Sequence, residues 1–444
     1  MQELFEWIKE QRITEVECLI PDMTGNARGK IVPASKFCTE SGMRLPEGIF
    51  VTTVTGDWPD DISTIDPAEI DMVLKPDFST ARLVPWASEP TALIIHDCYD
   101  QRGEPVSLSP RNLLKRILKL YSDRGWEPII APELEFYLVK SNTDPDYPLE
   151  PPVGRSGRAE TARQSYSIDA VNEFDPLFED IYDYCDMQEL SVDTLIHESG
   201  AAQMEFNFQH GNAMSLADQV FVFKRTVREA ALRHNIFATF MAKPMQHEPG
   251  SAMHMHISVN DQDGNNIFAG GSRELPNPRF LNFIAGMQKY MPAAMLFLAP
   301  NVNSYRRIAR EESAPINMQW GYDNRTAGLR VPICDQKNTR VENRVAGADT
   351  NPYIAFAAAL ACGYLGIKQK LTPTAPLEGT AYDLPFGLPR SPEQSVALLK
   401  QCPELVELMG ERFVDAYIAV KEKEYETFFA VISSWEREHL LLNV

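Results

Sequence analysis

The chain has 444 residues, of which 44% are hydrophobic, and its formal net charge is −20. This length can bury a large core, so two domains are expected. The strongly acidic balance argues against a nucleic acid or an anionic membrane surface as a general partner.

The N-terminal residues 1–13 are mixed and charged and lack the apolar core of a secretory signal. The longest apolar run, 353–367, is shorter than the roughly 20 residues of a membrane span and predicts a buried helix. The seven cysteines are odd in number and lack CxxC spacing, as is usual in a reducing compartment. A cytoplasmic location is therefore predicted.

The first hundred residues predict a small sheet domain. They contain one clear helix, 3–10, and strand-like runs at 15–21, 31–33, 72–75 and 92–97 between Pro, Gly and Asp turns. A boundary is expected near residue 107, because Ser109 can cap a helix and Pro110 can occupy its first turn. The predicted domains are 1–106 and 107–444.

A strand is predicted over residues 131–139, APELEFYLV. Alternation places Glu133, Glu135 and Tyr137 on one face, and Leu134 and Phe136 on the other. Two carboxylates held this close repel each other, and a bound cation would remove that penalty. This stretch alone leaves two interpretations open, a solvated strand face and a metal site.

After a long polar loop at 141–164, three further strands place ionisable or polar side chains on one face. These groups are Glu205 and Asn207, preceded by Glu198; His254 and His256; and Arg340, Glu342 and Arg344. Singly, each has a structural explanation, such as a hydrogen-bonded histidine or a surface ion-pair ladder. Together they favour a ligand site, because burying so many charges is costly without a counter-charge.

The residue types indicate which ligands such a site would hold. Carboxylates with imidazole and without thiolate suit Mg²⁺ or Mn²⁺ better than zinc. Residues 306–344 carry eight basic side chains against five acidic ones, and guanidinium groups match phosphate and carboxylate oxygens. This combination favours phosphoryl transfer from a nucleotide to an oxygen acceptor, and the lack of GxxxxGK[ST] excludes a P-loop.

An amphipathic helix is predicted at 215–234, and strands and helices then intermix to the end of the chain, which predicts an α+β fold. Six motifs in order resemble the glutamine synthetase family: PELEFYL, HESGAAQMEF, FMAKPM followed by GSAMHMH, NSYRR, NRTAGLRVP and TRVENRVAGADTNPY. The resemblance implies a small N-terminal β-grasp domain and a catalytic domain with an antiparallel half-barrel sheet and flanking helices. It also implies hexameric rings, single or double, with active sites between subunits.

The resemblance implies a role for each matching residue. The expected ligands of two or three Mg²⁺ or Mn²⁺ ions are Glu135, Glu198 and Glu205 on the amino-acid side, and Glu133, His254 and Glu342 on the nucleotide side. The expected ATP contacts are His256, Arg330 and Arg340. The expected contacts to glutamate and its phosphorylated form are Gly250, Arg307, Arg325 and Arg344.

The chain departs from ammonium-using members at two positions. Ser313 stands where they carry a glutamate beside the ammonium, and Val51 is the nearest match to a second acid from the first domain. Losing two carboxylates favours an alkylamine or polyamine, as in the γ-glutamylpolyamine synthetase branch, which the chain resembles more closely. The base that takes the amine's proton stays open among Glu312, Glu311 and Asp57. If the local alignment shifts by one residue, Glu312 is the usual glutamate.

Three smaller departures concern the glutamate contact, regulation and assembly. Pro249 replaces the asparagine that usually precedes the Gly-Ser pair. Tyr382 lies in TAYDLP, which resembles a loop adenylylated in some bacterial members, but its different surroundings argue against modification. The last residues, SWEREHLLLNV, are more polar than the tail that clasps two rings together, so single rings are an alternative to double ones.

The sequence thus predicts an ATP-dependent ligase that joins the γ-carboxylate of L-glutamate to a primary amine, in amine catabolism. One alternative is a true glutamine synthetase that uses ammonium. A non-catalytic protein of the same fold is a weaker alternative, because none of the expected metal ligands is missing.

Overall fold

The computed structural model describes residues 2–40, 43–161, 163–273, 275–310 and 313–444. Its helices are α1 (Gln2–Glu10), α2 (Ala34–Thr39), α3 (Pro110–Ser122), α4 (Ile168–Asn172), α5 (Asp175–Met187), α6 (Ala213–Arg233), α7 (Pro278–Leu298), α8 (Pro352–Gln369), α9 (Pro392–Lys400), α10 (Pro403–Met409), α11 (Glu411–Phe429) and α12 (Ser434–Leu440). Its strands are β1 (Glu15–Pro21), β2 (Ala27–Pro33), β3 (Met43–Pro46), β4 (Asp71–Pro76), β5 (Arg82–Leu83), β6 (Thr91–Tyr99), β7 (Trp126–Lys140), β8 (Val192–His197), β9 (Gln203–Phe208), β10 (Gly211–Asn212), β11 (Ile236–Thr239), β12 (Met253–Asp261), β13 (Trp320–Tyr322), β14 (Leu329–Val331) and β15 (Val341–Asn343).

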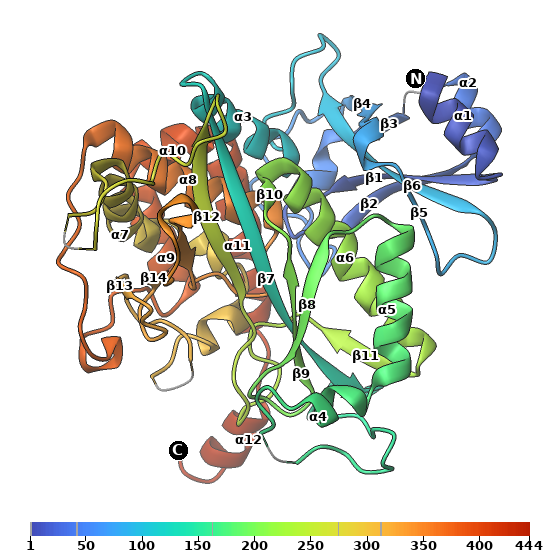
Figure 1. The fold of residues 1–444 in the computed structure, drawn as a ribbon. Helices are drawn as coiled ribbons and strands as arrows, with labels where there is room; N and C mark the ends of the chain where they lie inside the picture. The colour runs from blue at the N-terminus through green and yellow to red at the C-terminus, as the bar shows by residue number, and fades with distance from the viewer. Residues whose placement is uncertain (1, 41–42, 162, 274, 311–312) are drawn as a thin grey trace.

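The N-terminal sheet has the order β2-β1-β6-β4-β3, with β5 on β6. The β1 and β6 strands run parallel and the other pairs antiparallel. Leu4 and Ile8 of α1 and Phe37 of α2 are buried in one small core with this sheet, at the upper right of Figure 1. The four predicted strands are present, whereas β3 and β5 were not predicted, because such short strands carry too little alternation to recognise.

Helix α3 connects this sheet to the rest of the molecule. As predicted, the Ser109 hydroxyl caps its first turn and Pro110 is its first residue. Arg111 on this helix is buried and pairs with Asp77 and Asp97 beside the first sheet and with Asp218 on α6. Breaking a buried pair of this kind is strongly destabilising, so these side chains fix α3 between the two parts.

The larger sheet has the order β13-β14-β15-β12-β7-β9-β8, with β10 and β11 also on β7. The expected α+β class with flanking helices is confirmed, and Figure 1 shows the long β7 strand crossing the centre of the molecule. The sheet is antiparallel as expected except for β13 and β14, which pair in parallel. The apolar face of β7, including Leu134 and Phe136, is fully buried in the main core.

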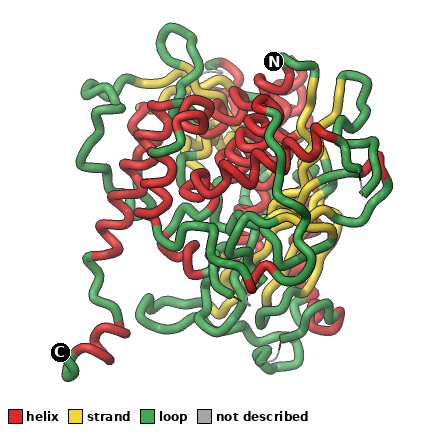
Figure 2. Tube along the Cα trace, turned by 90° about the vertical axis from the view of Figure 1, so that its left-hand side faces the viewer, coloured by secondary structure: helices red, strands yellow, loops and turns green. Residues whose placement is uncertain are grey.

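Helices cover the apolar side of this sheet. Helix α8 is buried along almost its whole length, as the apolar run predicts, and α6 lies where the amphipathic helix is expected. Figure 2 shows the helices gathered on one side of the molecule and most strands on the other. Within the described ranges, no helix combines the length and apolar character that crossing a membrane requires.

The four strands predicted to carry polar faces are neighbours in the sheet, in the order β15-β12-β7-β9. Glu133 on β7 lies opposite Asn207 on one side and His254 on the other. Glu135 pairs with Glu205, and His256 with Glu342. Because a shift of one residue would turn every side chain to the other face, this register is what assembles the site.

Candidate active site

Two cavities lie on the polar face of the larger sheet, one of about 1400 Å³ and one of about 500 Å³. Of the predicted site residues, the larger cavity contains Glu133, His256, Arg330 and Arg340. The smaller contains Glu133, Glu135, Glu198, Glu205, Gly250, His254, Arg307, Ser313, Arg325, Arg330 and Arg344. Three residues line both cavities, namely Glu133, Asn207 and Arg330. The predicted Glu312 lies outside the described residues.

Glu133 stands at this junction and bonds to two imidazoles. Its carboxylate oxygens lie 2.8 Å from His256 Nε2 and 3.3 Å from His254 Nδ1. Burial opposes ionisation of Glu133, but the hydrogen bonds from His254 and His256 outweigh it and lower its pKa. Burial and the nearby Arg344 together lower the pKa of His254 to about 4, so its imidazole is neutral and can bind a metal.

Of the four glutamates that line the smaller cavity, three have a raised pKa. Burial and the charge of Glu198 raise the pKa of Glu135 to about 8. Burial and the neighbouring carboxylates also raise the pKa of Glu205 well above its usual range. Burial is likewise the main reason that the pKa of Glu198 is raised. Acidic groups that disfavour each other's charge are what a bound cation would relieve.

The donor set fits a divalent cation. Ligand atoms of Glu133, His256 and Glu342 lie within 4.8 Å of one another, and so do those of Glu133, Glu205 and His254. Carboxylate oxygen with one imidazole per group suits Mg²⁺ or Mn²⁺. These groups both include Glu133 and differ from the two ligand sets that the family resemblance implies, which therefore stay predictions.

Glu342 is fully buried and pairs with two arginines of the site. Arg330 Nη1 donates to Glu342 Oε2 at 2.6 Å, and Arg344 donates to Glu342 Oε1. Burial opposes its ionisation, but Arg344 and His254 lower its pKa to about 2, so it is a fixed negative charge. Arg330 is held from its other side by Asp323, whose Oδ1 lies 2.6 Å from Arg330 Nη2.

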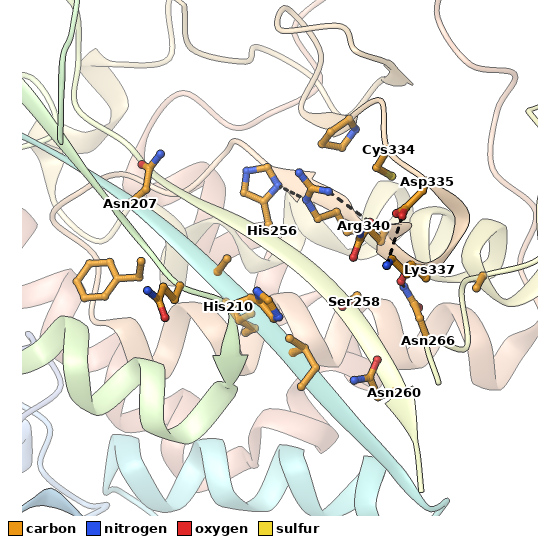
Figure 3. A pocket seen from close by; sticks show the side chains of 18 of the residues that line it. Asn207, His210, His256, Ser258, Asn260, Asn266, Cys334, Asp335, Lys337 and Arg340 are labelled. Atoms are coloured by element: carbon orange, nitrogen blue, oxygen red, sulfur yellow. Dashed lines mark hydrogen bonds and ion pairs between the residues drawn. The ribbon is translucent and has the colours of Figure 1, made fainter. Parts of the chain in front are cut away.

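Arg340 bonds to an imidazole, and Arg307 bonds to backbone carbonyl oxygens. Arg340 Nε lies 3.2 Å from His256 Nδ1, an interaction drawn in Figure 3. Arg307 is buried and donates to the carbonyl oxygens of Val345 at 2.8 Å and Arg344 at 2.9 Å. A guanidinium bound only by carbonyls keeps its positive charge available for an anion. Arg307 therefore presents positive charge to the smaller cavity, and Arg340 presents it to the larger one.

Residues 107–440 match the catalytic domain of glutamine synthetase. The chain belongs to the glutamine synthetase family.

Several members of this family resemble the chain over nearly its whole length. The γ-glutamylputrescine synthetase PuuA of Escherichia coli (strain K12) is 35% identical, over 100% of this chain and 95% of its own. A glutamate–isopropylamine ligase of a Pseudomonas species is 31% identical, over 97% and 95%. A glutamine synthetase of Pyrococcus abyssi (strain GE5 / Orsay) is 32% identical, over 96% and 92%.

The fold agrees with a solved structure of GmaS without ligand, with a TM-score of 0.85 at 26% identity over 100% of both chains. A complex of GmaS with ADP gives 0.86 at 25% identity, over 99% of this chain and 100% of the other. The chain is therefore a carbon–nitrogen ligase of the glutamate–amine class. Ligases of the glutamine synthetase family use ATP and divalent metals, which agrees with the donor set of the two cavities.

Gly250 lies at a close approach between two segments of the site. A Cβ atom there would lie 2.5 Å from Arg307 Cγ and 2.6 Å from the Ala242 carbonyl oxygen. Only glycine allows this close approach. The preceding residue, Pro249, turns its carbonyl oxygen to the Tyr137 hydroxyl, which donates to it at 2.7 Å.

Two further residues that were singled out from the sequence line the smaller cavity. Ser313 lines it, with a left-handed backbone (φ 61°). Tyr382 also lines it, and its hydroxyl donates to the Ala314 carbonyl oxygen at 3.1 Å. Val51 is buried, and neither Val51 nor Asp57 is among the described residues that line the two cavities.

Three residues that line the cavities were not given roles from the sequence, namely Gln203, Asn207 and Asp323. Gln203 is buried, and its Nε2 donates to Glu135 Oε2 at 3.2 Å and to the Gly250 carbonyl oxygen at 3.1 Å. Gln203 shares a face of β9 with Glu205 and Asn207, so the same alternation of side chains along the strand could have predicted its position in the site. Asp323 directly follows β13, a strand of only three residues, and gives no such signal.

Proposed function

We propose that the protein uses ATP to join the γ-carboxylate of L-glutamate to a primary amine or polyamine, through γ-glutamyl phosphate and with release of ADP. The observation that carries this proposal is that the two cavities meet at Glu133, Asn207 and Arg330. A nucleotide in the larger cavity would thus present its terminal phosphate to a carboxylate in the smaller. Transfer between such neighbours depends on positioning and charge stabilisation.

The larger cavity has the groups that a nucleotide triphosphate needs. Arg330, Arg340 and His256 line it and would contact phosphate oxygens. Two or three Mg²⁺ or Mn²⁺ ions would be held by the six predicted metal ligands. When bound, these ions would neutralise phosphate charge. The protein's own part is to hold Arg330 rigidly, through Asp323 and Glu342, where negative charge develops.

The smaller cavity would hold glutamate. Arg307, Arg325 and Arg344 line it and supply positive charge for the carboxylates of glutamate and for the acyl phosphate. Gly250 lines the same cavity, and its lack of a side chain lets the chain pass close to Arg307. The same arginines would stabilise the negative charge that develops on the tetrahedral intermediate when the amine attacks.

The acceptor is proposed to be an alkylamine or polyamine because Ser313 supplies no carboxylate to the smaller cavity, which Tyr166 and Tyr382 also line. Aromatic rings offer apolar surface to an alkyl chain, whereas the missing carboxylate removes one counter-charge for an ammonium ion. A protonated amine must lose a proton before it attacks. Glu311, Glu312 and Asp57 stay the candidate bases, of which Glu311 and Glu312 lie outside the described residues.

The test is phosphate release with ATP and glutamate, comparing putrescine, spermidine and monoamines with ammonium. We expect kcat/KM for the best amine to exceed that for ammonium by about 100-fold or more, the discrimination typical of a pocket shaped for its substrate. Mass spectrometry of the γ-glutamyl amide identifies the product. A preference for ammonium at millimolar concentration would instead identify a glutamine synthetase, and no turnover with any amine would indicate a non-catalytic protein.

The matched variant for this test is Ser313→Glu, which adds a carboxylate to the wall of the smaller cavity. It is expected to shift the preference from the amine toward ammonium, because a carboxylate favours a small cation. An unchanged preference in this variant would mean that another position sets acceptor choice.

We also propose assembly into hexameric rings, single or double, with active sites between subunits, and a cytoplasmic role in amine catabolism. Figure 2 shows the C-terminal segment, with α12, extending away from the body. Its apolar side chains are exposed, among them Phe429, Val431, Ile432 and Trp435. Exposed apolar patches commonly mark association surfaces.

Sedimentation velocity tests the assembly. We expect a hexamer or dodecamer for the full chain, and a smaller assembly after truncation at residue 430 if this segment joins subunits. A monomeric full chain would contradict the proposed ring and any contribution of a neighbour to the active site.

A further inference from the structure

Asn207 occupies the junction of the two cavities without a role in the function proposed above. It lies on β9, directly opposite Glu133 on β7 and two residues from Glu205 on the same face. It is one of three residues that line both cavities. Figure 3 shows Asn207 and His256 rising from the same face of the sheet on either side of β7.

Glu133 and Arg330 have side-chain hydrogen-bond partners, whereas the Asn207 amide oxygen has none among the described residues. Glu133 bonds to two imidazoles, and Arg330 pairs with Glu342 and Asp323. The Asn207 amide oxygen is buried and has no hydrogen-bond partner anywhere in the described ranges. Leaving a buried acceptor unsatisfied costs about 1–3 kcal/mol, so such an atom calls for a partner that binds with the substrates.

The surroundings decide what kind of partner this is. The neighbouring side chains include Glu133 and Glu205, and their carboxylate oxygens accept hydrogen bonds as the Asn207 oxygen does. Glu133, Glu205 and His254 form one of the two groups that could hold a metal ion. An amide oxygen beside carboxylates matches the oxygen donors that Mg²⁺ and Mn²⁺ bind, directly or through a water.

We propose that the Asn207 amide oxygen is a further ligand, direct or through a bound water, of a divalent cation bound where the two cavities meet. A neutral donor has an advantage at this position. It completes the coordination of the cation without adding negative charge where the terminal phosphate of the nucleotide must pass from one cavity to the other.

The test measures Mn²⁺ binding to the full-length protein by the paramagnetic resonance signal of free Mn²⁺, in the absence of nucleotide and amine. Asn207→Ala is expected to weaken binding of one Mn²⁺ by about 10- to 100-fold, the usual effect of removing a supporting group of a metal site. Asn207→Asp, which keeps an oxygen at the same place, is expected to bind Mn²⁺ at least as tightly as the unchanged protein.

Thr194→Ala is the matched control, because Thr194 on β8 pairs with Asn207 from the other side but is exposed and lines neither cavity. It is expected to leave Mn²⁺ affinity unchanged. Unchanged affinity in Asn207→Ala, or an equal loss in Asn207→Asp, would overturn the proposal, since the second result indicates a structural role.

This inference rests on the proposed function only for the presence of a divalent metal. Because Mn²⁺ binding is measured without an amine, a wrong acceptor assignment leaves the result for Asn207 intact. Equally, a failed Asn207 prediction leaves the phosphate-release comparison of amines as it stands.

Discussion

Replacing Glu133 by glutamine is expected to lower kcat/KM for ATP by about 10³-fold or more, the scale on which metal-site charge stabilises phosphoryl transfer. The change keeps the volume of the side chain but removes the charge that both imidazoles contact. It also removes the carboxylate common to both possible metal groups. Steady-state kinetics with ATP as the varied substrate, at saturating glutamate and amine, measure the effect.

Glu135→Gln is the informative comparison, because Glu135 lines only the smaller cavity. If Glu133 and Glu135 serve different metals, the first variant should mainly impair the use of ATP and the second mainly the use of glutamate. Glu127→Gln is the matched control, since it makes the same change at an exposed position of the same strand. Equal impairment of both substrates in both site variants would count against separate metals.

Arg330→Ala is the second variant for which a large loss is expected, again about 10³-fold in kcat/KM for ATP, as for other guanidinium groups that stabilise a transferring phosphoryl group. Arg330 joins the two cavities, and its removal also leaves the buried Glu342 with one guanidinium partner in place of two. Arg330→Lys retains the charge but cannot contact Glu342 and Asp323 with separate nitrogens.

A partial recovery in Arg330→Lys would therefore separate the contribution of charge from that of bidentate geometry. Thermal unfolding of both variants shows whether the loss is structural, because a destabilised protein would also unfold at a lower temperature. A variant with wild-type stability and wild-type use of ATP would refute a role for Arg330 at the phosphates.

The strands of the site could be predicted because alternation fixes which side chains share a face. This held for Glu133 and Glu135 on β7, and for His254 and His256 on β12. It held even around β15, where only residues Val341–Asn343 form the strand and Arg340 and Arg344 flank it. Period two is a local property, so a single sequence is enough to show it.

The pairing between strands could not be predicted in the same way. That Glu133 lies between Asn207 and His254 depends on hydrogen bonds between segments far apart in the chain, which no local pattern encodes. The pairing of Arg330 with Asp323 was missed for a similar reason, since β13 and β14 are three residues long. Residue types alone could suggest a metal site but could not say which carboxylates are closest.

The common wall of the two cavities has a thermodynamic consequence. Glu133, Asn207 and Arg330 face both cavities. A ligand that moves one of these side chains, or changes its charge, from one cavity therefore changes the binding surface of the other cavity. Binding equilibria linked in this way are reciprocal: the factor by which one ligand alters the affinity for the other is identical in both directions. The affinity of each cavity for its substrate therefore depends on whether the neighbouring cavity is already occupied.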